Sequence, residues 1–146
     1  MNQEQLKKSL NLGQIAQIGF VVRDLSKSIE NYEKAIGIGP FTILDIPHGK
    51  IATTQLTPQL ALELIEGDSG ETFHRDFLEK HGEGVQHLGF MTDECDEVLK
   101  RAESIGIEIL MRVEADVPHM GHVKAAYLDT YDLMGVVVEI IEVKPF

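Results

Sequence analysis

The sequence predicts an α+β fold in which two tandem β-α-β-β-β modules form a curved mixed sheet. Three observations support this prediction. Segments 15–22 and 85–92 open two copies of one unit, with Gly-Phe at matching places. Each opening is followed by helical periodicity that ends at Gly37 or Gly106, and then by three strand-like segments. Polar residues also recur at matched positions. Because each copy leaves an apolar face that its neighbour must cover, the repeat predicts a paired architecture.

The first module spans residues 15–67 and begins with a strand over 15–22. Asp24 or Ser26 is expected to cap the next helix, and the glycines and proline of 37–40 to end it. Apolar residues recur along this helix at helical spacing, namely Leu25, Ile29, Tyr32, Ala35 and Ile36. Turn sequences at 47–49 and 57–59 separate three predicted strands, near 41–47, 50–57 and 60–66.

The second module spans residues 85–146 and repeats this order. A helical connector over 68–84, amphipathic at 71–81, joins the two modules, and residues 1–14 form an N-terminal extension. The predicted elements are a strand over 85–92, a helix over 94–105, and strands near 107–114, 122–129 and 135–142. The second helix has an apolar stripe formed by Val98, Leu99, Ala102 and Ile105.

Composition excludes several classes of function. The formal net charge of −11 argues against nucleic-acid binding, because a phosphate backbone attracts a basic surface. A single cysteine, Cys95, cannot form an internal disulfide, which is typical of a reducing compartment. The N-terminus lacks the apolar run of a secretory signal, and no apolar stretch approaches the roughly 20 residues that span a bilayer. We therefore expect a soluble, cytoplasmic protein that has no membrane segment; the charge does not exclude an anionic small molecule as its ligand.

Four ligand-type side chains occupy equivalent places in the two modules. Gln17 and His87 form one pair (87 − 17 = 70), and Glu63 and Glu139 form the other (139 − 63 = 76). Strand alternation puts each glutamate on a face with apolar neighbours. An ionised carboxylate there is costly unless it is compensated, and a divalent cation compensates it well. The sequence therefore predicts one metal site between the modules, in a cleft.

The mixed oxygen and nitrogen ligands suit Ni²⁺, Co²⁺, Zn²⁺, Mn²⁺ or Fe²⁺, without choosing among them. Taken singly, each residue has an ordinary alternative, because a strand glutamate usually faces solvent and a strand histidine is usually hydrogen-bonded in a core. Glu66 and Glu142 also repeat, but they end their strands on the opposite phase. We expect those two carboxylates to be solvated.

At these residues the chain resembles the vicinal oxygen chelate superfamily, over nearly all of 14–143. The run Phe77-Leu78-Glu79-Lys80-His81-Gly82-Glu83-Gly84-Val85-Gln86-His87 and the closing run over 135–142 resemble methylmalonyl-CoA epimerases within it. The resemblance implies paired modules, a divalent metal that chelates adjacent substrate oxygens, an acyl-CoA or 2-oxo substrate, and a homodimer. The implied reaction is epimerisation or isomerisation at a carbon next to a carbonyl.

Two positions depart from the epimerases. They usually carry histidine where this chain has Gln17, and a catalytic glutamate in the turn that here reads 46–50. The four ligand-type residues instead match the metal set of some glyoxalase I enzymes, although the positions aligned with that enzyme's substrate arginines are Val21 and Glu83. A glyoxalase-type lyase acting on a hemithioacetal is therefore an alternative. A non-catalytic small-molecule binding protein of the resistance type is a third.

The resemblance also suggests roles for individual residues. Glu139 is expected to move the substrate proton, and His48 is the candidate base for the opposite face. His119, His122 and Lys124 lie on or beside the loop that differs between the modules. They are expected to neutralise an anionic group of the substrate, such as a carboxylate or a phosphate.

Overall fold

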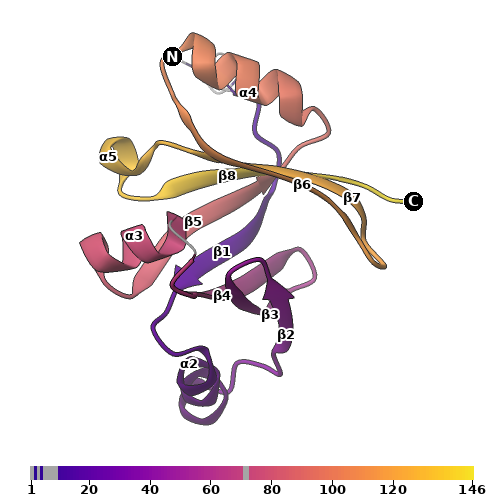
Figure 1. The fold of residues 1–146 in the computed structure, drawn as a ribbon. Coiled ribbons are helices and arrows are strands. Elements are labelled where there is room, and N and C mark those ends of the chain that lie inside the picture. Colours follow the sequence, from indigo (N-terminus) through magenta and orange to yellow (C-terminus); the bar gives the residue numbers. More distant parts are fainter. Residues whose placement is uncertain (1, 3, 5–9, 71–72) are drawn as a thin grey trace. The chain divides into compact units, whose positions relative to one another are not determined.

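The computed structural model describes residues 2, 4, 10–70 and 73–146 (Figure 1). These residues form two compact units. One comprises residues 16–87, and the other comprises 88–146 together with the segment that ends at Ile15. Much of the predicted N-terminal extension, and residues 71 and 72 of the predicted connector helix, lie outside the described residues.

The strands of the first unit run in the order β2-β3-β4-β1. Strands β1 and β4 pair in parallel, whereas β2 with β3 and β3 with β4 pair antiparallel. The elements of this module and of the connector are β1 (Ile15–Val21), α2 (Leu25–Asn31), η1 (Tyr32–Ile36), β2 (Thr42–Ile46), β3 (Gly49–Thr57), β4 (Leu60–Gly67) and α3 (Phe73–His81).

The first helix begins at a side-chain cap, as expected. The carboxylate of Asp24 accepts a hydrogen bond from the backbone N–H of Lys27 at 2.9 Å. Its last turn, η1, is a π-helix that ends at Gly37, whose φ of 77° is left-handed. A π-turn holds an extra residue and so rotates the side chains of the helix end relative to the preceding turns. Ile36, predicted to lie on the apolar face, is therefore 66% exposed, whereas Leu25 is buried.

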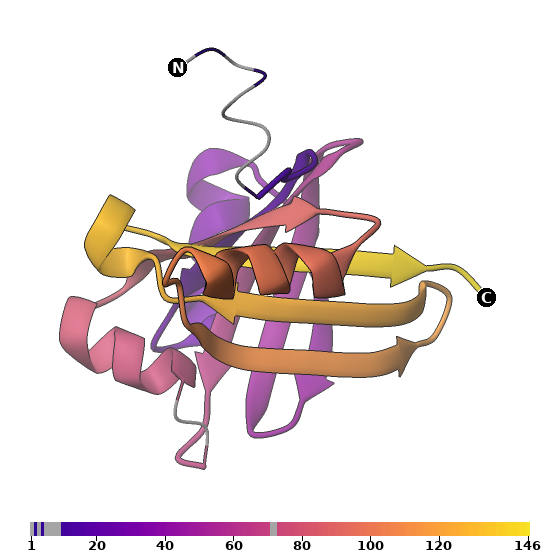
Figure 2. The ribbon, with the colours of Figure 1, turned by 90° about the horizontal axis from the view of Figure 1, so that it is seen from above.

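The strands of the second module run in the order β5-β8-β7-β6. Helix α4 packs on β7 and β8, and in Figure 2 it is drawn over them, running roughly along the direction of the strands. The boundary between the compact units falls within β5. The elements of this module are β5 (Gly84–Met91), α4 (Cys95–Ser104), β6 (Ile109–Val117), β7 (Gly121–Leu128), α5 (Tyr131–Met134) and β8 (Val137–Lys144).

One face of α4 forms the core of its unit with the strands beneath it. Val98, Leu99 and Ala102 are buried there, as the apolar stripe predicts. Ile105 is 57% exposed, because it is the residue after the last helical turn and its backbone has left the helical conformation. Cys95, at the first turn, contributes to the core instead.

The α+β class and the two β-α-β-β-β modules are confirmed. The second module differs from the first in a short extra helix, α5, and in a β6 strand that extends to Val117. No helix among the described residues is both long enough and apolar enough to cross a membrane.

Candidate metal centre

Three of the four predicted ligands meet within the unit of residues 16–87. The side-chain amide of Gln17 donates through Nε2 to Oε2 of Glu63 at 2.9 Å. Its Oε1 lies 3.1 Å from Nε2 of His87, and that nitrogen lies 3.8 Å from Oε1 of Glu63. An amide oxygen from β1, a carboxylate from β4 and an imidazole nitrogen from β5 therefore lie close together.

The parallel pairing of β1 with β4 explains how these side chains meet. Gln17 stands opposite Ala61, and Gly19 stands opposite Glu63. Side chains at alternate positions of a strand share a face, so Gln17 and Glu63 project from the same side of the two strands. Gly19 has no side chain, and the ring of His87 lies directly against it. The carboxylate of Glu63 is buried at this place, as its apolar neighbours predict.

The donor set fits a divalent transition-metal ion. Imidazole, amide and carboxylate are all accepted ligands of such ions. Two neighbouring donors that each lie about 2.1 Å from one ion are themselves roughly 3 Å apart in an octahedral shell. The separation of 3.1 Å between His87 Nε2 and Gln17 Oε1 matches that spacing. Only two of the three residues are histidine or an acid, and among the described residues no three His, Cys, Asp or Glu side chains form a metal-binding group.

Glu139, the fourth predicted ligand, lies on β8 of the other unit. It is 6% exposed and stands opposite Tyr127 of β7. Two residues further along β8, Ile141 stands opposite Ala125. This register puts Glu139 on a largely apolar face, as strand alternation predicts. Within the repeat, β8 is the counterpart of β4, which carries Glu63.

His48 lies in the two-residue turn between β2 and β3. Its φ is 60°, and its side chain is 64% exposed with Nδ1 3.6 Å from Oδ1 of Asp68. Gly49, the first residue of β3, is four residues from Thr53, which stands opposite Glu63. At about 3.3 Å per residue, the turn is therefore roughly 13 Å along the strand from the metal-site candidates. The structure does not bring His48 together with them.

The three predicted substrate-binding residues lie on or beside the β6–β7 hairpin. Lys124 and His122 project from the face of β7 opposite to that of Tyr127. Lys124 forms an ion pair with Asp96 at 3.0 Å, and His119 is exposed in the turn with a φ of 65°. None of the three is brought together with Glu139, and their role in substrate binding stays a prediction.

His122 is held between two acids. Its Nδ1 lies 2.7 Å from Asp116 and its Nε2 lies 2.8 Å from Glu114. The hydrogen bonds to Asp116 and Glu114 raise the pKa of His122 above its usual value. A substrate anion at this residue would have to compete with both carboxylates.

The expectation that Glu66 and Glu142 are solvated is wrong. Oε2 of Glu66 accepts from the backbone N–H of Leu25 at 2.6 Å, and Oε2 of Glu142 accepts from that of Cys95 at 2.8 Å. Each carboxylate thus caps the helix that begins beside its strand end, where the N–H groups are otherwise unpaired. The repeat of these two acids is structural.

Sequence reasoning also missed two residues beside His87. Gln86 and His74 are both buried, and Oε1 of Gln86 lies 2.9 Å from Nδ1 of His74. The same oxygen lies 3.1 Å from Nδ1 of His87. The spacing of Gln86 from His87 could not reveal this contact, because adjacent residues of a strand normally point to opposite faces.

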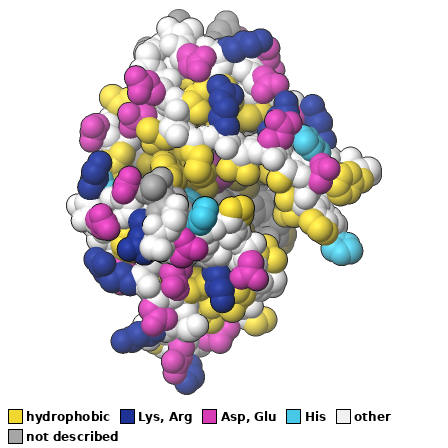
Figure 3. Space-filling model, in the orientation of Figure 1, with side chains coloured by type: hydrophobic (Ala, Val, Ile, Leu, Met, Phe, Trp, Pro, Cys, Tyr) yellow, Lys and Arg dark blue, Asp and Glu magenta, His cyan; other side chains and the backbone are white. Residues whose placement is uncertain are grey.

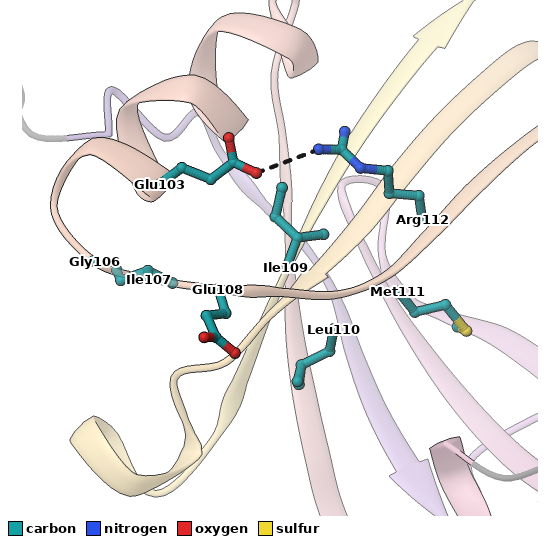
Figure 4. A pocket seen from close by; sticks show the side chains of 8 residues that line it. All are labelled: Glu103, Gly106, Ile107, Glu108, Ile109, Leu110, Met111 and Arg112. Atoms are coloured by element: carbon teal, nitrogen blue, oxygen red, sulfur yellow. Dashed lines mark ion pairs between the residues drawn. The ribbon is translucent and has the colours of Figure 1, made fainter.

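A surface hollow of about 730 Å³ follows the edge strand β6 in the other unit. Figure 4 shows Glu103 and Arg112, 3.7 Å apart, on one side of the strand and Leu110 on the other. The hollow is lined by Glu103, Gly106, Ile107, Glu108, Ile109, Leu110, Met111 and Arg112. None of the predicted catalytic, metal-binding or substrate-binding residues is among them.

The surface charges do not gather by sign on the face drawn in Figure 3. Lysine and arginine side chains are scattered among aspartates and glutamates, with apolar side chains between them. Among the described residues on this face, lysine and arginine form no continuous basic stripe of the kind that binds a phosphate backbone, in line with the net charge of −11.

Residues 16–127 match the family model of the glyoxalase/bleomycin resistance protein/dioxygenase superfamily. Because this match covers most of the chain, the chain belongs to that superfamily. The resemblance expected from the repeat and from the strand glutamates is thereby confirmed.

Similar solved structures include methylmalonyl-CoA epimerases. The Mycobacterium tuberculosis epimerase is 21% identical with a TM-score of 0.71, over 92% of this chain and 90% of that one. A Streptomyces coelicolor epimerase variant in complex with 2-nitronate-propionyl-CoA is 25% identical with a TM-score of 0.72, over 90% and 94%. A hypothetical protein of Bacillus halodurans C-125 is 21% identical with a TM-score of 0.74, over 91% and 96%.

Proposed function

We propose that this protein is a divalent-metal-dependent epimerase or isomerase that moves a proton at a carbon adjacent to a carbonyl. An acyl-CoA such as methylmalonyl-CoA is the proposed substrate. The observation that supports the proposal most directly is the convergence of Gln17, Glu63 and His87. The likeness to epimerases crystallised with acyl-CoA ligands supports the choice of substrate.

Gln17, Glu63 and His87 are the proposed metal ligands, and the repeat adds Glu139 as the fourth. A bound divalent ion would supply positive charge that stabilises the enolate oxygen of the substrate. The ion would be Ni²⁺, Co²⁺, Zn²⁺, Mn²⁺ or Fe²⁺. Glu63 contributes a negative charge to this site, whereas Gln17 contributes a neutral oxygen.

Glu139 is the proposed proton carrier. Its carboxylate takes the proton from the α-carbon, and the C–H bonding pair passes into the enolate. Return of a proton to the opposite face of that carbon completes epimerisation, and return to the adjacent carbon completes isomerisation. The buried, largely apolar setting of Glu139 keeps the carboxylate away from bulk water. His48 stays the second candidate for the opposite face, and His119, His122 and Lys124 stay the candidates for the anionic end of the substrate.

A glyoxalase-type lyase is the second candidate function. Gln17 favours this function, because epimerases usually carry a histidine at its position, whereas the ligand-type residues of this chain match the metal set of some glyoxalase I enzymes. The side-chain amide of Gln17 donates to Glu63. The proton chemistry is nearly the same, but the substrate is a hemithioacetal of a thiol. A homodimer and a cytoplasmic location are further expectations from the resemblance and the composition.

The first experiment measures the metal content of untagged protein purified without chelator, by inductively coupled plasma mass spectrometry. We expect close to one equivalent of a transition metal per chain, and a large loss of it in Glu139→Gln. Glu79→Gln, at an exposed position on α3, is the matched control and should keep its metal. No metal in the wild-type protein, even after reconstitution, would favour a binding protein of the resistance type.

The second experiment follows deuterium wash-in from solvent at the α-carbon of methylmalonyl-CoA by NMR. We expect wash-in with the wild-type protein and a loss of about 10²–10⁴-fold in Glu139→Gln. Thiol-dependent consumption of methylglyoxal without any wash-in would select the lyase.

A further inference from the structure

Gln86 places one oxygen between two imidazole rings. Its side chain is 0% exposed, and Oε1 lies 2.9 Å from Nδ1 of His74 and 3.1 Å from Nδ1 of His87. His74 comes from α3 and His87 from β5, so the oxygen joins the connector helix to a proposed metal ligand. All three residues lie in the unit of residues 16–87.

The side-chain amide of Gln86 can present either its oxygen or its nitrogen to the two imidazole rings. Which of these atoms faces them determines which ring nitrogen of His87 carries the proton. An amide oxygen only accepts hydrogen bonds, so both Nδ1 atoms must carry hydrogen to bond to it. A neutral His87 that is protonated at Nδ1 has a lone pair at Nε2. This lone pair faces Oε1 of Gln17, another acceptor, at 3.1 Å. Two acceptors that face each other are compatible when a cation lies between them.

The opposite orientation of the Gln86 amide would reverse this arrangement. Its nitrogen would donate to the two Nδ1 atoms, and His87 would then carry its proton at Nε2 and donate it to Gln17. That network would leave no lone pair for a metal ion. In the observed orientation, Nε2 of Gln86 is buried and has no hydrogen-bond partner within the described part of the chain. Buried polar groups are normally paired, so an orientation of Gln86 that leaves this nitrogen unpaired within the described chain calls for an explanation.

We propose that Gln86 is a positioning residue that holds His87 in the Nδ1-protonated tautomer, so that Nε2 is available to a divalent cation. His74 holds the amide of Gln86 from the other side. The part of this inference that concerns the cation rests on the proposed function, whereas the part that concerns the tautomer does not. Partners of this kind on the second ring nitrogen of a metal-ligating histidine generally change metal affinity by 10- to 100-fold.

Two substitutions test this role. Gln86→Leu removes the acceptor, whereas Gln86→Glu keeps an acceptor at the same reach. Thr54→Val is the control, because Thr54 is also buried and lies on the face of its sheet opposite to that of Glu63. The tautomer of His87 is read from long-range ¹H–¹⁵N NMR of histidine-labelled protein, and Zn²⁺ affinity from isothermal titration calorimetry.

We expect Nδ1-protonated His87 in the metal-free wild type, in Gln86→Glu and in Thr54→Val, and Nε2-protonated His87 in Gln86→Leu. Zn²⁺ affinity should fall about 10- to 100-fold in Gln86→Leu and keep its wild-type order in Gln86→Glu and Thr54→Val. An Nε2-protonated His87 in the metal-free wild type would overturn the inference. So would unchanged Zn²⁺ affinity in a folded Gln86→Leu.

The two readouts separate this inference from the proposed function. If the wild type binds no divalent ion, the proposed metal site fails, but the tautomers in metal-free protein still decide the role of Gln86. If the wild type binds Zn²⁺ and His87 has the same tautomer in all variants, the metal site stands and the positioning role fails. Gln86→Glu keeps the test open if Gln86→Leu does not fold.

Discussion

The Cα of Gly19 lies directly against the imidazole ring of His87. A Cβ built on Gly19 would overlap with three ring atoms of that histidine. Gly19 also stands opposite Glu63 in the parallel pairing of β1 with β4. The missing side chain thus makes the space in which a proposed metal ligand lies beside its partners.

Gly19→Ala should therefore displace His87. The new methyl group meets a ring that belongs to a buried cluster, and forced packing of this kind costs about 1–3 kcal/mol. We expect a lower free energy of unfolding in urea and at least a tenfold loss of Zn²⁺ affinity, since a ligand must lie close to its ideal position. Gly37→Ala serves as a control for the loss of a glycine, because nothing lies near its Cβ position, although its left-handed backbone carries its own cost. Wild-type Zn²⁺ affinity in a folded Gly19→Ala would contradict the packing argument.

Glu63→Gln should weaken metal binding without removing the hydrogen bond from Gln17. The amide oxygen still accepts from Nε2 of Gln17, but the negative charge is lost. Because hard divalent ions prefer carboxylate to amide, we expect at least a tenfold lower affinity for Mn²⁺. Calorimetric titration checks this, with Glu79→Gln as the surface control. Equal affinities in the two variants would remove Glu63 from the ligand set.

His48→Asn separates a catalytic role from a turn role. Asparagine tolerates the left-handed backbone found at this position, so the turn should be preserved. A general base contributes about 10²–10⁴-fold to rate, and an exposed turn residue contributes nothing. The exposure of His48 favours the turn role, so we expect deuterium wash-in to stay within an order of magnitude of wild type. A loss of a hundredfold or more with unchanged metal content would make His48 a base.

The sequence predicts much of the candidate centre, because each ligand repeats at an equivalent strand position. Gln17, Glu63 and His87 are expected to meet, and they do. The contact of Gln86 with His74 could not be predicted, because His74 comes from a helix whose approach depends on tertiary packing. Strand alternation tells which face a side chain takes and leaves open which residues pack on that face.

The same limit explains the error at Glu66 and Glu142. Both end their strands, which favours solvent, but in each unit a helix begins within hydrogen-bonding distance. The backbone repeats as well, since Val22 donates to Ile65 and Thr92 donates to Ile141, each at 2.9 Å. A repeat in sequence therefore marks positions that share a structural role as readily as positions that share a chemical one.

Glu142 should make folding sensitive to acid. The hydrogen bond from the Cys95 backbone and the pairing with Lys144 hold the pKa of Glu142 below its usual value, although partial burial opposes them. Because the folded pKa is the lower one, the stabilisation is present above the unfolded pKa of about 4.3 and is lost as pH falls through the folded value.

We therefore expect Glu142→Ala to lower the free energy of unfolding by about 0.5–2 kcal/mol at pH 7, as for the loss of a helix cap. The difference from wild type should shrink below pH 4 or so. Urea unfolding followed by circular dichroism at several pH values checks this. A difference that stays constant down to pH 3 or so would contradict the role of the charge.

His122 should contribute stability with the opposite dependence on pH. Asp116 and Glu114 raise its pKa in the folded state through hydrogen bonds. A raised pKa means that the stabilisation is complete below the unfolded value of about 6.5 and is lost as pH rises through the folded value. The thermal midpoint of the wild type should therefore fall, relative to that of His122→Gln, as pH rises above about 6.5. Differential scanning calorimetry across this window measures the effect, and an NMR titration of the His122 ring follows its charge directly. If the thermal midpoints of the wild type and of His122→Gln changed in parallel with pH, Asp116 and Glu114 would bind the charged His122 ring no better than the neutral one. A substrate anion could then replace these carboxylates at His122 without loss of stability.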